Sequence, residues 1–245
     1  MFKWSQADTI AIPIALFIIV ALTIILYFVT KNKSDKIKSI PLKVVAGFLI
    51  VLEIAKQIYY ISSGTYPLNV IPVHFCSLIV VLIAFAQFMP AKIANWFHVP
   101  SVVFSFVVLP LVLVHPHAMI GSASQGVFVN FHHFHAFVFH MLVIAYPIFN
   151  LVLIKKQLKL SNSFNLVACI AFYASYAIPV AFKLNINYMN ILYSYFAPLE
   201  EFRLACGQVV YDIVLFLIST LACVCLFMLW YVIDKKVTQR RNKNA

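Results

Sequence analysis

The sequence predicts an all-α protein, a polytopic membrane bundle of seven transmembrane helices with the N-terminus outside and the C-terminus in the cytoplasm. Three observations predict it: the composition, the length of the apolar stretches and the distribution of basic residues. Of the 245 residues, 64% are apolar and 10% are charged. Soluble domains contain about 45–50% apolar and about 25% charged residues. A water-soluble fold cannot bury this much apolar surface, whereas a bilayer accepts it on every outward-facing helix.

Seven apolar stretches reach the roughly 20 residues that a helix needs to cross a bilayer. They cover residues 9–30, 40–61, 70–89, 99–115, 129–154, 164–182 and 208–233. The first stretch is too long for a signal-peptide core and lacks a small-residue cleavage site, so we expect it to be retained. The sequence therefore predicts a single transmembrane domain over residues 1–245 that ends in a basic cytoplasmic tail, 234–245.

Proline punctuates several of these stretches. The fourth is the weakest prediction, because Pro100, Pro110 and Pro116 interrupt it. Proline within a span is tolerated where neighbouring helices satisfy the carbonyl groups that it leaves unbonded. We therefore keep the fourth span and expect similar kinks in the first, fifth and sixth, at Pro13, Pro147 and Pro179.

The basic residues are segregated by side of the membrane. With seven spans, one face carries only Lys3, Lys183 and Arg203. The opposite face carries Lys31, Lys33, Lys36, Lys38, Lys43, Lys92, Lys155, Lys156, Lys159, Lys235, Lys236, Arg240, Arg241 and Lys243. Cytoplasmic loops are rich in Lys and Arg, so the second face is the cytoplasmic one. Basic residues in short loops are topology signals, and they argue against a groove that binds nucleic acid.

Cofactor and metal chemistry leave no clear trace in the sequence. The five cysteines include no C-x-x-C pair, and we interpret them as small core residues. A metal site needs three or four convergent ligands, and the sequence contains no H-E-x-x-H segment. We therefore predict neither a metal nor a cofactor.

Ionisable residues within the spans are the first functional candidates, because they are costly in a bilayer. Glu53, Lys56 and Gln57 occupy the outer part of the second span. Glu53 and Lys56 are three residues apart and can form an ion pair on one helix face. This pair is either a structural link between helices or part of a functional site.

The fifth span carries a cluster of histidines: His132, His133, His135 and His140. At 100° per residue, His133 and His140 fall within about 20° of each other, and all four lie on a face about 160° wide. This face is expected to point into the bundle, because imidazoles that face lipid lack hydrogen-bond partners. An alternative is that they are interfacial imidazoles bonded to loop carbonyls.

The remaining histidines follow the same distribution. His115 and His117 close the fourth span, and His74 opens the third. Only His98 is expected in a cytoplasmic loop. The polar groups of the spans therefore gather toward the outer half of the bilayer.

Three motifs resemble a known family. The segment Pro72–Ser77 resembles the L-P-L-H-L-C-S segment of the bacterial YwaF-type integral membrane proteins. Phe131–Phe134 with His140 is similar to that family's histidine-bearing span, and Asn187–Met189 is similar to its N-Y-M-F-L motif. The order and spacing of the motifs agree, and the resemblance covers about residues 45–235.

The resemblance implies lipid acyl chemistry. A eukaryotic relative of that family is a transmembrane acyltransferase acting on phospholipids, and a more distant one cleaves fatty-acid esters of hydroxy fatty acids. The acyltransferase has its cysteine directly before a histidine, whereas this chain has Val73 there and its nearest thiol, Cys76, two residues beyond His74. Residues 74 and 76 of one helix point about 200° apart. His74 and Cys76 can therefore act together only if the backbone there is not helical.

The leading hypothesis is acyl transfer or hydrolysis on a membrane lipid at the outer half of the plasma membrane. His133 or His140 would act as the general base, oriented by Glu53 or Asp212. The alternatives are a proton-linked transporter or channel, and a non-enzymatic membrane component. The oligomeric state stays open.

The nucleophile in this hypothesis is Cys76, Ser77 or an activated water. A buried thiol is unreactive unless a cation or imidazole lowers its pKa, which a histidine near Cys76 would do. The predicted catalytic set is His74, Cys76, His133, His140 and Glu53.

Overall fold

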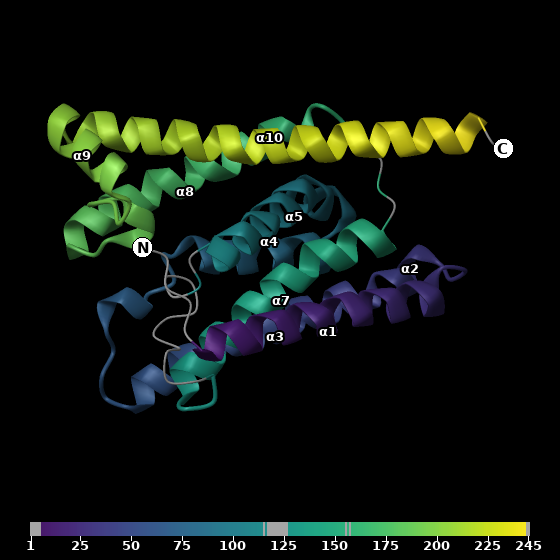
Figure 1. Ribbon diagram of the computed structural model, residues 1–245, viewed down its shortest axis with the longest axis horizontal. Helices are drawn as coiled ribbons and strands as arrows, with labels where there is room; N and C mark the ends of the chain where they lie inside the picture. Colours follow the sequence, from purple (N-terminus) through teal and green to yellow (C-terminus); the bar gives the residue numbers. More distant parts are fainter. Residues whose placement is uncertain (1–5, 115, 117–126, 155, 157, 244–245) are drawn as a thin grey trace. The chain divides into compact units, whose positions relative to one another are not determined.

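The computed structural model describes residues 6–114, 116, 127–154, 156 and 158–243, and within these ranges the regular structure is helical (Figure 1). The α-helices are α1 (Gln6–Thr30), α2 (Asp35–Lys38), α3 (Ile40–Ser62), α4 (Phe75–Phe88), α5 (Ala91–Val114), α7 (Phe131–Leu153), α8 (Asn162–Leu184), α9 (Ala197–Cys206) and α10 (Gln208–Lys243). Two short 3₁₀ helices are η1 (Leu68–Val70) and η3 (Tyr188–Asn190).

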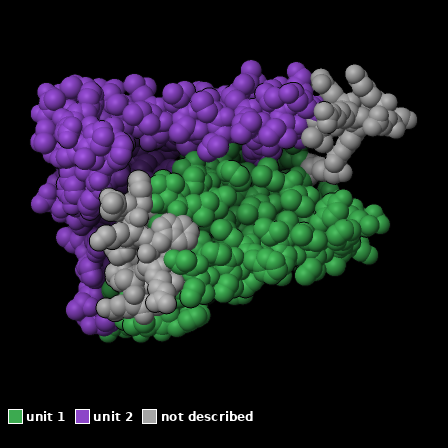
Figure 2. Space-filling view, viewed as in Figure 1, with its two compact units in different colours: residues 1–62, 79–156 green, residues 63–78, 157–245 purple. Residues whose placement is uncertain are grey.

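The helices form two compact units, shown in green and purple in Figure 2. Unit 1 comprises Met1–Ser62 and Ile79–Lys156. Unit 2 comprises Ser63–Leu78 and Gln157–Ala245. The boundary falls within α4, so the first turn of that helix belongs to unit 2 and the remainder to unit 1.

Helix α7 is the central element of unit 1, where it packs against α1, α3 and α5. Its core side chains include the fully buried Ile144 and Tyr146. Helix α5 contributes Phe104, which is also fully buried. Apolar residues around most of its circumference make α7 a helix that other helices surround.

In unit 2, α8 and α9 each pack against α10. The largest fully buried side chains of this unit are Tyr188, Tyr211 and Phe227. Helices α9 and α10 are separated by one residue, Gly207, whose φ of 82° and ψ of 165° are a conformation that only glycine adopts readily. This glycine allows the chain to change direction between the two helices.

The class predicted from the sequence, a helical membrane bundle, is confirmed. Six of the described helical segments are long and apolar enough to cross a membrane: Thr9–Thr30, Leu68–Phe88, Ala91–Val114, Phe131–Leu153, Asn162–Leu184 and Gln208–Lys236. The predicted second span forms α3, a continuous helix of 23 residues that is not among these six. The count of seven spans and the orientation remain predictions.

Two α-helices begin at other residues than the predicted spans. The third predicted span, 70–89, corresponds to the candidate span Leu68–Phe88, and its α-helix begins at Phe75 because Pro72 lies in an irregular turn before it. The fourth starts at Ala91 and not at residue 99, because the carbonyl of Pro90 accepts hydrogen bonds from the amides of Ile93 and Ala94 and opens the helix there. His98 therefore lies within α5, where it is buried, and not in a loop.

Other helices agree with the predicted spans or continue beyond them. Helix α10 continues to Lys243, so most of the segment predicted as a basic tail is helical. Pro13, Pro147 and Pro179 lie within α1, α7 and α8. His115 and His117, predicted to close the fourth span, lie outside the described residues.

Candidate functional site

In unit 1, helix α3 carries a charged pair in the middle of an apolar sequence. Lys56 Nζ lies 2.8 Å from Glu53 Oε1, and Gln57 Nε2 donates to the same oxygen at 2.9 Å. Both charged side chains are 16% exposed. The predicted ion pair is confirmed. A single charge at this largely buried position would be destabilising, and the two opposite charges neutralise each other.

His135 of α7 shares the environment of this pair. It lies within electrostatic range of Glu53 and Lys56, and only 5% of its surface is exposed. One turn further along, its ring stacks on Phe139 at a centroid distance of 5.4 Å. The neighbouring His132 is exposed, and its Nδ1 lies 2.8 Å from the hydroxyl of Tyr60 on α3. Helices α3 and α7 thus bring carboxylate, ammonium, phenol and imidazole groups together.

His133 and His140 are buried on α7. His140 Nδ1 lies 2.7 Å from the carbonyl oxygen of Ala136. Because a carbonyl can only accept, Nδ1 carries the proton, and the basic lone pair of the neutral ring is on Nε2. The expectation of an inward face holds for His133, His135 and His140 and fails for His132.

The first turn of α7 depends on an N-cap. Asn130 Oδ1 accepts a hydrogen bond of 2.9 Å from the backbone amide of His133. Replacing Asn130 by alanine is expected to lower the free energy of unfolding by about 1 kcal/mol, because that amide then loses its partner. Denaturant unfolding in detergent would measure it. Asn130→Asp retains an acceptor and is the control. Equal losses in both variants would contradict the capping role.

An apolar groove adjoins the polar cluster in unit 1. It has a volume of about 570 Å³ and is lined by α1, α3 and α7 with apolar side chains alone, among them Leu22, Val44, Phe48, Phe137, Met141 and Phe149. Val138 and Leu142 of its lining are three and seven residues from His135, so they lie on the same side of α7 as that imidazole. From Phe137 to Phe149 the groove follows α7 for about 18 Å at 1.5 Å per residue. Its length and lining suit one extended hydrocarbon chain.

In unit 2, His74 lies immediately before α4. Its Nε2 is 3.1 Å from the carbonyl oxygen of Asn69, and its ring meets the ring of Tyr188 edge to face at 4.9 Å. The hydroxyl of Tyr188 donates to the carbonyl of Leu68 at 2.8 Å. The segment Pro72–Ser77 and the Asn187–Met189 motif therefore contact each other through His74 and Tyr188.

Cys76 lies in the first turn of α4 and is partly buried. It is within electrostatic range of Tyr173 on α8, whose ring also meets Phe75 at 5.4 Å. Because His74 precedes the helix, the 200° separation that a continuous helix would impose on residues 74 and 76 does not apply. The backbone thus meets the condition under which His74 and Cys76 could act together.

The candidate residues are divided between the two units. Glu53, His133 and His140 belong to unit 1. His74, Cys76, Ser77 and Asp212 belong to unit 2. Within unit 1 the structure brings Glu53 to His135, and within unit 2 it brings His74 to Tyr188. Asp212 accepts a hydrogen bond of 2.9 Å from Gln208 on the same helix.

Among the described residues, no group of three or more His, Cys, Asp or Glu could hold a metal ion.

Comparison with known proteins identifies the family. The model of the TMEM164 family matches residues 1–231. The chain belongs to the TMEM164 family. This is a family of membrane proteins, and with the six apolar helices it makes the protein a multi-pass membrane protein. Neither a curated protein nor a solved structure matches the chain.

Two residues of this TMEM164-family chain, His135 and Tyr188, are absent from the catalytic set predicted from the sequence, although the structure places each beside a member of that set. His135 was counted with its neighbours, and the structure places it within electrostatic range of Glu53. Tyr188 is fully buried, and its ring contacts that of His74. The signal for Tyr188 was its place in the Asn187–Met189 motif.

Proposed function

We propose that the protein transfers or hydrolyses acyl groups of lipids in the plasma membrane. The observation that carries the proposal is the contiguity, within unit 1, of a buried polar cluster and an apolar groove. A lipid ester has the same two parts, a polar carbonyl and a long hydrocarbon chain. The resemblance to YwaF-type proteins, and through them to a phospholipid acyltransferase, supports the same chemistry.

In this mechanism the acyl chain lies along α7 in the groove, and the ester reaches the level of His135 and His140. The imidazole takes a proton from the nucleophile through its lone pair, which His140 carries on Nε2. The nucleophile attacks the ester carbonyl carbon, and the carbon–oxygen bond of the leaving alcohol breaks. The imidazolium then returns the proton to the departing alkoxide. Within unit 1 a water molecule supplies the attacking atom, and within unit 2 Cys76 or Ser77, beside His74, is the alternative nucleophile.

The ion pair has an electrostatic role in this scheme. Burial and the Lys56 ammonium favour the neutral form of the His135 imidazole, which is the form that can accept a proton, and the Glu53 carboxylate opposes them more weakly. Low water content around the cluster strengthens these interactions.

A labelling experiment tests the proposal. The purified protein is treated with a fluorophosphonate and, separately, with a thiol-reactive lipid analogue, and labelling is compared among the parent, His133→Ala, His140→Ala and Cys76→Ala. We expect loss of labelling in at least one histidine variant, and in Cys76→Ala if the thiol is the nucleophile. His132→Ala and Cys225→Ala are the controls, because both side chains are exposed. Equal labelling of the parent and of every variant would rule out an acyl-enzyme intermediate.

Proton-linked transport is the second candidate, and a separate observation favours it. Unit 1 buries polar groups between α5 and α7, away from the charged pair: the hydroxyl of Tyr146 accepts from Gln87 at 2.8 Å and lies 3.2 Å from Ser101 Oγ. Asn150, one turn further along α7, is 1% exposed. Polar side chains of this kind within a span commonly mark an ion or proton pathway. Proton uptake into proteoliposomes, lost in Asn150→Leu and with lipid turnover absent, would favour transport.

A further inference from the structure

The segment between α8 and α10 has an unusual backbone. Three of its non-glycine residues adopt the left-handed conformation: Asn185, Met189 and Asn190, with φ of 52°, 51° and 63°. Asparagine tolerates this region, but methionine rarely adopts it. Such a conformation persists only where surrounding contacts determine it, and it often occurs at functional sites.

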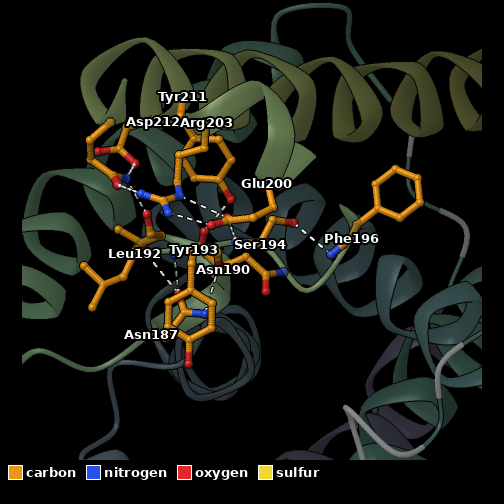
Figure 3. A network of polar contacts seen from close by, with 12 residues as sticks. Asn187, Asn190, Leu192, Tyr193, Ser194, Phe196, Glu200, Arg203, Tyr211 and Asp212 are labelled. Atoms are coloured by element: carbon orange, nitrogen blue, oxygen red, sulfur yellow. Dashed lines mark hydrogen bonds and ion pairs between the residues drawn. The ribbon is translucent and has the colours of Figure 1, made fainter. Parts of the chain in front are cut away.

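Contacts from α9 hold one side of this segment (Figure 3). Glu200 Oε2 accepts a hydrogen bond of 2.7 Å from the backbone amide of Ser194 and one of 2.9 Å from Arg203 Nε. Asn187 Oδ1 accepts from the amides of Leu192 and Tyr193 at 2.9 and 3.3 Å. The loop is therefore closed on itself by Asn187 and attached to α9 by Glu200.

Contacts from α10 hold the other side. Arg203 Nη1 donates to Gln208 Oε1 at 3.2 Å, and Gln208 Nε2 donates to the carbonyl of Ile191 at 2.7 Å. The hydroxyl of Tyr211 donates to the carbonyl of Asn190. We refer to Asn187, Glu200, Arg203, Gln208 and Tyr211 as the clasp. It attaches residues 190–194, which contain and follow the last left-handed residue, to two helices.

The residue that the clasp immobilises is Tyr188. It directly follows Asn187, is fully buried, and contacts His74 through its ring and Leu68 through its hydroxyl. His74 Nε2 donates to the carbonyl of Asn69, since a carbonyl can only accept. The neutral His74 ring consequently has its basic lone pair on Nδ1. Tyr188 fixes the plane of this ring on one side and the Leu68–His74 segment on the other.

We infer that the clasp is a positioning device, which holds Tyr188 against His74 and thereby fixes the orientation and tautomer of that imidazole. Tyr188, Glu200 and Arg203 are positioning residues and do not touch a substrate. Only the use of His74 in catalysis rests on the proposed function; the positioning itself does not. All of these residues belong to unit 2.

The clasp stays charged over the pH range of an ordinary assay. The hydrogen bonds that Arg203 and the amide of Ser194 donate lower the pKa of Glu200 to about 2, and the bond to Glu200 raises the pKa of Arg203. A carboxylate with a lowered pKa loses its pairing only as the pH falls through that lowered value. Between pH 5 and 8 a change at His74 therefore reports the imidazole and not the ionisation of the clasp.

Chemical modification of His74 tests the inference without any assumption about enzymatic activity. Diethylpyrocarbonate acylates the unprotonated imidazole nitrogen, and peptide mass spectrometry follows each histidine by itself. In Glu200→Gln we expect His74 to react about fivefold faster than in the parent, the change that one lost hydrogen bond produces. We also expect the pH midpoint of that rate to shift. Glu201→Gln, a neighbouring carboxylate on the same helix, is the matched control and should resemble the parent.

Tyr188→Phe is the second variant, because it keeps the ring contact and removes only the bond to Leu68. Tyr188→Phe should raise the rate at which His74 is modified. In Arg203→Lys this rate should lie between those of the parent and Glu200→Gln, because lysine lacks the planar guanidinium group that donates two parallel hydrogen bonds. His132 in unit 1 is the internal reference. If the rate and pH midpoint of His74 modification are unchanged in Glu200→Gln and Tyr188→Phe, the inference is overturned. An equal increase in the modification rate of His132 would also overturn it. Faster His74 modification without any lipid turnover would support positioning and refute only the proposed function.

Discussion

His140→Gln is expected to lower the turnover of a lipid ester by roughly 10²- to 10⁴-fold, the usual contribution of a general base. The basic lone pair of His140 is on Nε2, because Nδ1 donates to the carbonyl of Ala136. Glutamine retains a donor that can reach this carbonyl, but it cannot take up a proton near neutral pH. Turnover of a fluorescent phospholipid in proteoliposomes would measure the loss.

The control for this variant is His132→Gln on the same helix. His132 is exposed and bonds to Tyr60, so its replacement should leave turnover within about threefold of the parent, as for a surface change. Thermal unfolding of both variants separates loss of chemistry from loss of fold. Equal activity of His140→Gln and the parent would remove His140 from the mechanism and leave His135 or His133 as the base.

Removing one member of the Glu53–Lys56 pair is expected to have the largest effect on stability. A fully buried pair costs about 3–5 kcal/mol when one partner is lost, because the other charge stays buried and unpaired. These side chains are 16% exposed, so we expect roughly 2 kcal/mol for Glu53→Gln or Lys56→Met. The double variant should regain most of that loss. Denaturant unfolding in detergent provides the four free energies of the double-mutant cycle.

A second ion pair provides the comparison. Lys38 lies 3.8 Å from Asp35, and the aspartate is exposed. Removing Asp35 should cost less than about 1 kcal/mol, because water already solvates this pair. A Glu53→Gln variant as stable as Asp35→Asn would show that the pair in α3 does not stabilise the fold. If the double variant is stable but inactive, the pair serves chemistry and not structure.

Several features of the site could be predicted from the sequence. Residues three apart on a helix are neighbours, so the pairing of Glu53 with Lys56 needed no tertiary information. The burial of His133 and His140 followed from their common face. The start of α4 at Phe75 was missed because the apolar run continues through the turn before it, and the start of α5 at Ala91 was missed because Lys92, Asn95 and His98 interrupt the apolar pattern of its first turns.

The partners of the imidazoles could not be predicted. His135 lies within electrostatic range of Glu53 and Lys56, and nothing in the sequence around it indicates this. The rotation and level of α7 against α3 decide this, and both depend on packing along the whole length of the helices. The contact of His74 with Tyr188 joins residues more than a hundred positions apart through a left-handed turn that propensities disfavour.

The sequence by itself determined that this is a helical membrane protein, because a long apolar segment in lipid must satisfy its backbone hydrogen bonds internally, and a single helix does so without any other part of the chain. Only the tertiary structure decided which polar side chains meet. Those meetings depend on how far each helix is rotated and displaced against its neighbours, and on a loop conformation that distant contacts from α9 and α10 maintain.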